Sequence, residues 1–245
     1  MILIIGSNHD DVLYYESLLS NPKELTILTR YHALSGTISA QEVMVIQDVY
    51  TSFVSATLVS HIISQYYISV VISVGRCELI KGSPRVGDVV FSESVLFGDV
   101  DQIAAVKGTE LGQIPGFPRI YPTSLELINN TKKCLNNIGS GKYYSATFIS
   151  SSFFRQNKER VYDLTHDEYI QSLNQNVVLD GESAGVALAC FLHDVPCISI
   201  KLVEAKAGEY TTLDNYLLVL KQSATVGKAV AAFIGEISRT DIIRS

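Results

Sequence analysis

The stretch VLDGESAGVALAC, residues 178–190, runs from an apolar, strand-like segment directly into a helix of small apolar residues. Two carboxylates, Asp180 and Glu182, stand at the joint, in surroundings that otherwise indicate a buried segment. A strand that passes straight into a helix is the building unit of α/β folds, and in such sheets ligands bind beyond the carboxyl ends of the strands. The stretch therefore predicts an α/β fold and directs the search for a functional site to the residues that follow each strand.

The same alternation of strands and helices extends along the chain. Residues 70–72 are apolar on successive positions and residues 197–200 nearly so, which predicts strands that are covered on both faces. No linker-like or repetitive segment divides the 245 residues, and the most polar segment, Gln156–Gln175, is interpreted as an excursion from the core. We predict a single α/β domain over residues 1–245, with a central mixed β-sheet flanked by helices. The expected strands are 2–5, 42–47, 69–74, 88–91, 144–149, 177–179 and 197–203, and the expected helices are 51–66, 123–137, 183–192 and about 212–237.

Composition excludes several classes of protein. With 47% hydrophobic and 18% charged residues, the chain is predicted to be globular rather than disordered. A net charge of −6 without a basic cluster argues against a nucleic-acid partner and favours a small neutral or weakly charged one. The opening MILIIGSNHDD is interpreted as a core strand and not as a signal peptide. No uncharged apolar stretch reaches the ~18 residues of a membrane helix.

The cysteines are scattered and show no CxxC spacing; they are Cys77, Cys134, Cys190 and Cys197. Reduced, mostly buried thiols are typical of cytoplasmic proteins. We therefore expect a cytoplasmic protein with no disulfide framework, no metal site, no cofactor and no membrane partner.

Polar side chains follow the predicted strands. They combine acids, an arginine, hydroxyls and paired aromatic rings, a set that suits a polyol such as ribose beside a stacked base. Each also has a plain structural interpretation, since an aspartate before a helix is often a cap and paired phenylalanines are often core. The segments after the strands are 6–11 (GSNHDD), 75–78 (GRCE), 150–154 (SSSFF), 180–182 (DGE) and 204–206 (EAK).

The order of these segments is more specific than any one of them. Taken together, they resemble the nucleoside phosphorylase and nucleosidase superfamily, and within it the 5′-methylthioadenosine/S-adenosylhomocysteine nucleosidases. The resemblance covers nearly the whole chain and implies the three-layer fold of that family. The matching segments are the opening strand with its glycine and acidic turn (1–12), the strand that ends in a glycine (69–75), VGDVV (86–90), GQIPGFP (112–118), DGESA (180–184) and the C-terminal helix.

The resemblance implies hydrolysis of the N-ribosidic bond of a 5′-modified adenosine, with release of adenine. By position, Glu182 falls on the glutamate that holds the ribose hydroxyls, and Asp11 on the carboxylate that orients and deprotonates the attacking water. Phe153 falls on the aromatic residue that stacks on the base, and Phe154 on the residue that reads the base edge. The family also implies a homodimer in which each subunit completes the 5′ pocket of its neighbour.

Two departures affect the acid–base chemistry. The family protonates the purine with an aspartate at the end of an R-A-I-S-D strand, but this chain has KLVEA at 201–205, so that position is Ala205. Glu204 lies one residue earlier, and because side chains alternate along a strand it replaces the aspartate only if the strand end is bulged. Asp11 is one methylene shorter than the family's glutamate, and a displacement of ~1 Å can cost ~100-fold in rate.

Further departures surround the expected pocket. Tyr50 lies where the family has a glycine-rich turn, and Gly181 replaces a methionine between the two acids, which is expected to leave the space beneath the ribose less filled. Pro115 belongs to the GQIPG loop and is counted with the substrate-binding residues. Arg76 replaces a small hydroxyl residue, and Lys107 replaces an aromatic residue that the partner subunit contributes.

Arg76 and Lys107 have two interpretations. They form salt bridges to Glu78 or Glu110 and otherwise face solvent, or they meet a carboxylate on the 5′ substituent, as in S-adenosylhomocysteine or aminodeoxyfutalosine, a menaquinone precursor.

Three functions therefore remain open from the sequence. The first is a nucleosidase that uses Asp11, Glu182 and Glu204. The second, suggested by Ala205, is a nucleoside-binding or interaction protein without turnover on the same scaffold. The third is a phosphorylase, which residues 8–11 disfavour because they contain two acids and no arginine for phosphate.

Overall fold

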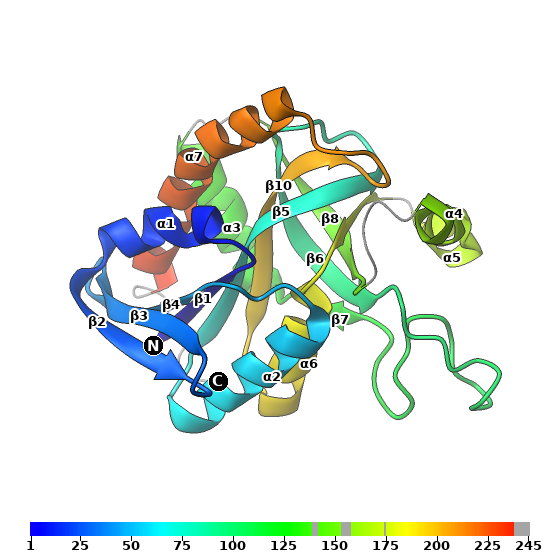
Figure 1. The fold of residues 1–245 in the computed structure, drawn as a ribbon, viewed down its shortest axis with the longest axis horizontal. Coiled ribbons are helices and arrows are strands. Elements are labelled where there is room, and N and C mark those ends of the chain that lie inside the picture. The colour runs from blue at the N-terminus through cyan, green and yellow to red at the C-terminus, as the bar shows by residue number, and fades with distance from the viewer. Residues whose placement is uncertain (139–141, 153–157, 174, 238–245) are drawn as a thin grey trace.

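The computed structural model describes residues 1–138, 142–152, 158–173 and 175–237. Strands and helices alternate over most of this length (Figure 1). In chain order they are β1 (Ile2–Gly6), α1 (His9–Leu18), β2 (Ser20–Ile27), β3 (Tyr31–Ile38), β4 (Gln41–Ile46), α2 (Ser52–Gln65), β5 (Val70–Lys81), β6 (Val89–Phe97), β7 (Tyr121–Pro122), α3 (Leu125–Ile138), β8 (Tyr143–Ser150), α4 (Lys158–His166), α5 (Glu168–Ser172), β9 (Asn176–Asp180), α6 (Ser183–His193), β10 (Cys197–Lys206) and α7 (Leu213–Ile237).

The described strands form one mixed sheet, in the order β10-β6-β8-β9-β5-β1-β4-β3-β2, with β7 paired to β6. Strand β10 also pairs with β5, so β10, β6, β8, β9 and β5 close on themselves, while β1, β4, β3 and β2 extend from β5 as an open wing. Strand β1 pairs in parallel with both β4 and β5, and all five of its residues are buried. This explains its continuous apolar sequence, because helices cover both faces of the sheet.

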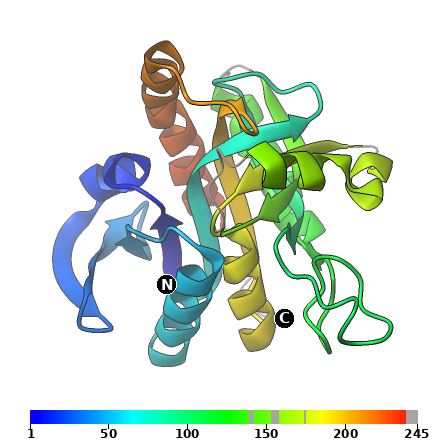
Figure 2. The same ribbon diagram turned by 45° about the vertical axis from the view of Figure 1, so that its right-hand side comes forward.

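Helices α1, α3 and α7 pack on one face of the sheet, and α2 and α6 pack on the other (Figures 1 and 2). Helix α6 is made of small residues because it lies directly against α2. A Cβ atom at Gly185 would lie 2.0 Å from the Ser52 carbonyl oxygen and 2.2 Å from the Ser55 hydroxyl. The Ser55 hydroxyl in turn donates to the Glu182 carbonyl at 2.8 Å. The predicted α/β fold with a central mixed sheet and flanking helices is confirmed, although its partial closure into a barrel was not expected.

The helix–strand alternation in the first forty residues was only partly predicted. Helix α1 and the β2–β3 hairpin were not predicted from the sequence, because β2 is largely exposed and lacks an alternating apolar pattern. The polar excursion contains α4 and α5, which pack through Val161, Leu164 and Ile170.

Helix α7 is long and apolar enough to cross a membrane by length and composition. Its buried residues include Val226, Val230, Phe233 and Ile234, which belong to the core cluster on the α1–α3–α7 face of the sheet. A core helix and a membrane helix meet the same compositional test.

Candidate functional site

The ends of β1 and β9 and the middle of β10 meet around the middle of β5. The strand registers place Gly6 beside Val74, Lys201 beside Gly75, and Leu179 beside Glu78. Three chain segments that are far apart in sequence therefore reach the same short part of β5. The candidate site is built from the side chains that follow these positions.

Glu182 is the N-cap residue of α6, but its side chain makes no capping hydrogen bond. Instead the Lys201 ammonium group donates to Glu182 Oε1, and the Ser7 hydroxyl, at the end of β1, hydrogen-bonds to the same carboxylate. Only 2% of Glu182 is exposed, and Lys201 is completely buried. A buried carboxylate that does not cap its own helix is available for another role.

Asp180, Glu182 and Lys201 form a buried charge cluster. The Oδ2 atom of Asp180 lies 2.7 Å from Lys201 Nζ, and the Asp180 carboxylate also accepts hydrogen bonds from the hydroxyls of Ser150 and Ser183 and from the Ser183 backbone N–H at 3.3 Å. Asp180 therefore ties the start of α6 to β8 and β10. The expectation that it supports the helix start agrees with this arrangement, and it also shares the charge of Lys201.

The charge cluster shifts the titration of its members. Burial and the charge of Asp180 raise the pKa of Glu182 to about 7, although Lys201 and the Ser7 hydrogen bond act in the opposite direction. Burial alone lowers the pKa of Lys201, but Asp180 and Glu182 outweigh it and hold that pKa above its ordinary value. Lys201 is thus a permanent cation between the two carboxylates.

Asp11 lies at the third position of α1, directly after β1. It forms a capping box in which its Oδ2 accepts from the Asn8 backbone N–H at 3.0 Å and from Asn8 Nδ2 at 3.2 Å. Its Oδ1 accepts from Arg76 Nε at 3.1 Å. Gly75 permits this approach, since it has φ +136° and a Cβ atom there would lie 3.1 Å from Asp11 Oδ2.

Arg76 does not pair as the sequence predicted. Its described ion-pair partners are Asp11 and Asp10, the latter 3.6 Å from Nη2, whereas Glu110 pairs with Arg119. The partner prediction of Glu78 or Glu110 was therefore wrong for Arg76. The physical reason is the strand register, which places residue 76 next to the exit of β1 and the first turn of α1.

Strand β10 has a register shift between Val203 and Ala205, where the sequence predicts a residue for base protonation. Val203 lies beside Cys77, but Ala205, two residues later, lies beside Glu78. Glu204 is therefore the extra residue of a β-bulge, and both it and Ala205 are buried. A bulge re-aims side chains out of strict alternation, so the irregular strand end that the prediction for Glu204 requires is present.

Gly181 is enclosed by the segment that contains Tyr50. A Cβ atom at Gly181 would lie 2.5 Å from the Tyr50 carbonyl oxygen, and the Ser52 hydroxyl donates to the Gly181 carbonyl at 3.1 Å. The space left by the missing methionine side chain is thus filled by backbone. The Tyr50 side chain is 54% exposed and its hydroxyl donates to Asp48 at 3.0 Å.

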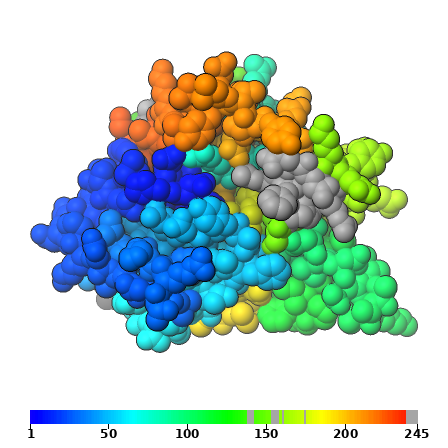
Figure 3. All heavy atoms as spheres, viewed as in Figure 1, coloured from blue at the N-terminus to red at the C-terminus, as the bar shows by residue number. Residues whose placement is uncertain are grey.

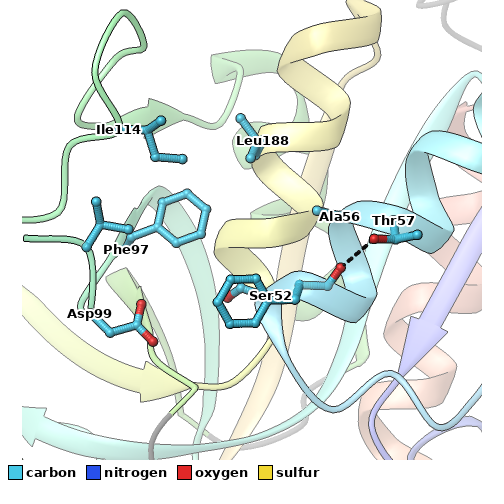
Figure 4. Close-up of a pocket in the computed structure, with 9 residues that line it drawn as sticks. Ser52, Ala56, Thr57, Phe97, Asp99, Ile114 and Leu188 are labelled. Carbon is cyan, nitrogen blue, oxygen red and sulfur yellow. Dashed lines mark hydrogen bonds between the residues drawn. The ribbon is translucent and has the colours of Figure 1, made fainter.

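An apolar pocket of ≈ 360 Å³ opens between α2, α6 and the loop from β6 to β7 (Figure 4). Phe97, Ile114 and Leu188 surround it, and Asp99 lies at its edge. The loop extends at the lower right of Figure 1 and forms the green corner of Figure 3. Pro115 and Lys107 lie on this loop and are exposed.

Phe153 and Phe154, the expected base-stacking and base-edge residues, lie outside the described residues. The structure adds participants that were not among the predicted site residues: Lys201, Ser7, Asn8 and Tyr216. For Lys201 a signal was present, since it is the lysine within the apolar run CISIKLV. Ser7 and Asn8 lie in the strand-exit segment 6–11, which marks the region but not their partners, and Tyr216 has no local signal because it reaches the site only through the tertiary fold.

Comparison with known proteins gives a consistent result. The family model described as Phosphorylase superfamily matches residues 2–237. A 5′-methylthioadenosine/S-adenosylhomocysteine nucleosidase of Chromohalobacter salexigens is 26% identical over 237 residues, which cover 95% of this chain and 96% of that protein.

Solved structures share the fold. The 5′-methylthioadenosine/S-adenosylhomocysteine nucleosidase of Neisseria meningitidis, in complex with methylthio-immucillin-A, has a TM-score of 0.85 at 20% identity and covers 96% of this chain and 98% of that chain. A futalosine hydrolase mutant of Helicobacter pylori has a TM-score of 0.83 at 19% identity, with coverage of 96% and 98%.

Proposed function

Because the chain belongs to the phosphorylase superfamily, we propose that it is a nucleosidase that hydrolyses the N-ribosidic bond of a 5′-modified adenosine and releases adenine. The observation that supports this most strongly is the buried Glu182 carboxylate, which makes no capping hydrogen bond to its own helix and is held by Lys201 and Ser7. The related proteins named above act as nucleosidases or as a futalosine hydrolase by their names.

In the proposed mechanism Glu182 accepts hydrogen bonds from the ribose hydroxyls. Cleavage of an N-glycosidic bond develops positive charge on the sugar, and a fixed carboxylate stabilises that charge in a site from which water is excluded. Lys201 and Ser7 fix the orientation of the carboxylate before the substrate arrives, so little reorganisation is needed in the transition state. Gly181 precedes Glu182 in the chain, and the segment that contains Tyr50 packs against it.

Asp11 orients the attacking water and takes its proton. It follows β1, and the Ser7 contact to Glu182 brings the end of that strand to the ribose carboxylate. A carboxylate at hydrogen-bond distance from a water is the general-base arrangement that hydrolysis requires.

Glu204 donates a proton to the leaving adenine in this proposal. Its place at the β-bulge and its burial support the role, since a buried carboxylic acid at a bulge can face the ligand where an ordinary strand residue would not. Phe153 stacks on the base, and Phe154 reads its edge.

Two other functions make different predictions. A nucleoside-binding protein without turnover remains the alternative that Ala205 suggests. A phosphorylase is less well supported, because Arg76 already pairs with the carboxylates of Asp10 and Asp11 and those acids repel phosphate.

One assay separates the three functions. The protein is incubated with methylthioadenosine, S-adenosylhomocysteine and aminodeoxyfutalosine, with and without inorganic phosphate, and free adenine is measured. Release without phosphate supports the nucleosidase, and release that depends on phosphate indicates a phosphorylase. Tight binding without release at any pH indicates a binding protein.

The assay also decides between substrates. Arg76 is occupied by two carboxylates, so the case for a carboxylate on the 5′ substituent rests on Lys107. Preference for S-adenosylhomocysteine or aminodeoxyfutalosine supports that case and a role in menaquinone biosynthesis for the latter, whereas preference for methylthioadenosine supports methionine salvage.

We also propose a cytoplasmic homodimer in which the neighbour covers the apolar pocket between α2, α6 and the β6–β7 loop. Exposed aromatic and aliphatic side chains border this region: Tyr50, Phe53, Phe191 and Leu192. An apolar patch of this kind is typical of a protein interface. Through the exposed loop, Lys107 and Pro115 reach the 5′ pocket of the partner subunit.

A further inference from the structure

We propose that Arg76 is a positioning residue, which holds the Asp11 carboxylate in the orientation that the attacking water requires. The inference rests on the proposed hydrolysis. It assigns to Arg76 a role toward Asp11 rather than toward the substrate.

Both oxygens of the Asp11 carboxylate accept hydrogen bonds, and the donors come from two different elements. Asn8 binds Oδ2 through its backbone N–H and its side-chain amide, and both of these groups belong to the start of the same helix, α1. Arg76, on β5, binds the other oxygen, Oδ1, at 3.1 Å. Donors from two separate elements fix the rotation of the carboxylate about its side-chain bonds, which the Asn8 contacts at a single oxygen do not. The Asp11–Arg76 ion pair is largely shielded from solvent, because the exposed fraction is 2% for the Asp11 side chain and 11% for that of Arg76.

Arg76 is itself held in place. Asp10 Oδ2 lies 3.6 Å from Nη2, and the guanidinium carbon lies 5.1 Å from the centre of the Tyr216 ring on α7. The Tyr216 hydroxyl donates to Asp10 Oδ2 at 2.8 Å, which closes the cluster. A planar guanidinium group can face two carboxylates and a ring at once, whereas a lysine ammonium group cannot.

Because the side chain of Asp11 is short, its carboxylate must be fixed in position by a residue such as Arg76. An aspartate has one methylene fewer than a glutamate with which to reach a bound water, and a misplacement of ~1 Å can cost ~100-fold in rate. Arg76 restrains Asp11, which contacts the water and not the nucleoside. Its loss should therefore lower kcat and leave KM nearly unchanged.

A binding role for Arg76 predicts a different pattern. If its guanidinium group met a carboxylate on the 5′ substituent, its loss would raise KM for S-adenosylhomocysteine and spare methylthioadenosine. A positioning role lowers kcat by the same factor for both substrates.

The test compares Arg76→Ser, Arg76→Lys, Asp11→Glu and the double variant Asp11→Glu/Arg76→Ser in the adenine-release assay. We expect Arg76→Ser to lower kcat by roughly 100-fold on both substrates. Arg76→Lys keeps the charge but not the two-sided geometry, so its loss should be smaller. In the double variant the longer Glu side chain reaches the water without Arg76, and kcat should recover by at least roughly tenfold over Arg76→Ser.

Arg119→Ser is the matched control. Arg119 also pairs with a carboxylate, that of Glu110, and lies 3.7 Å from the centre of the Tyr169 ring, with 14% of its side chain exposed. It should keep the wild-type kcat. Thermal unfolding of every variant checks that it is folded.

Three results would overturn the inference: a normal kcat in Arg76→Ser, an equal loss in Arg119→Ser, or a loss that the double variant does not recover. A selective rise of KM for S-adenosylhomocysteine would overturn it as well. If the wild-type protein releases no adenine, the proposed function fails instead.

Discussion

Lys201 shows how much one side chain decides in this protein. It lies completely buried between the carboxylates of Asp180 and Glu182, and it connects the end of β9 to β10. The two buried carboxylates require a buried cation beside them, because any one of the three charges alone in the interior would be strongly unfavourable.

We predict that Lys201→Met lowers the free energy of unfolding by about 3–5 kcal/mol at pH 8, since it leaves two buried carboxylates without a cation. Urea unfolding followed by circular dichroism measures the loss. The loss should shrink at pH 5, where protonation of Glu182, whose pKa is about 7, removes part of the uncompensated charge. A decrease below about 1 kcal/mol at pH 8 would contradict the structural role that we assign to the cluster.

Glu182 gives a prediction for the dependence of activity on pH. Its pKa of about 7 lies above the ordinary value of 4.5, so the neutral form is favoured in the fold and ionisation costs stability as pH rises between these two values. The ribose-binding role needs the ionised form. We expect kcat/KM to fall about tenfold per pH unit below pH 7 and to level off above it.

The control for this profile is Glu182→Gln. It should reduce kcat/KM and remove the acidic limb centred on Glu182. A wild-type profile that is flat between pH 5.5 and 8 would show that Glu182 does not titrate in the functional range.

At the scale of secondary-structure elements, the contact between α6 and α2 positions Glu182. The two helices approach so closely that the backbone of Ser52 occupies the place of a side chain at Gly185. Glu182 begins α6, so a displacement of this helix also displaces the carboxylate.

We predict that Gly185→Ala destabilises the protein by about 1–3 kcal/mol, because the added methyl group overpacks the interface. Calorimetry or denaturant unfolding measures the change. Gly235→Ala in α7 is the matched control, because its Cβ atom would meet only ordinary contacts at 3.6 and 3.7 Å from Ser39. Alanine should stabilise that helix by about 0.5–1 kcal/mol. Equal effects at the two glycines would refute the close-packing explanation.

At the scale of the whole molecule, the exposed apolar surface around α2 is the surface on which the proposed dimer rests. Phe53 is 73% exposed and lines the pocket between α2, α6 and the β6–β7 loop. Burial of such a ring at a subunit interface stabilises a dimer.

We predict that Phe53→Asp shifts the protein from dimer to monomer and raises KM for methylthioadenosine, because the neighbour no longer covers the 5′ pocket. Sedimentation velocity measures the assembly. Leu125→Asp is the control, since Leu125 is 77% exposed at the start of α3, on the other face of the sheet. A monomeric wild-type protein with full activity would exclude the proposed interface.

Much of the fold could be predicted from the sequence. Strands β1, β5 and β10 were predicted from their apolar runs, and helix α6 from its segment of small apolar residues. The β2–β3 hairpin and α1 were not, because most residues of β2 are exposed and α1 has few buried side chains. For the site, Glu182 and Asp11 could be named as candidates from their places after strands, but their partners could not.

By itself, the sequence determined the α/β class and the acids at the strand exits, since these depend on local periodicity and residue identity; only the resemblance to the family marked Ala205 as a position where an aspartate is expected. Only the tertiary structure decided what those acids contact. Because of the strand register, Arg76 pairs with Asp11 and not with Glu78, the partner considered from the sequence. The same register places Lys201 between Asp180 and Glu182. The bulge at Glu204 is likewise a property of strand pairing. In the stretch VLDGESAGVALAC, the acids are therefore explained by a lysine that follows eleven residues after its end.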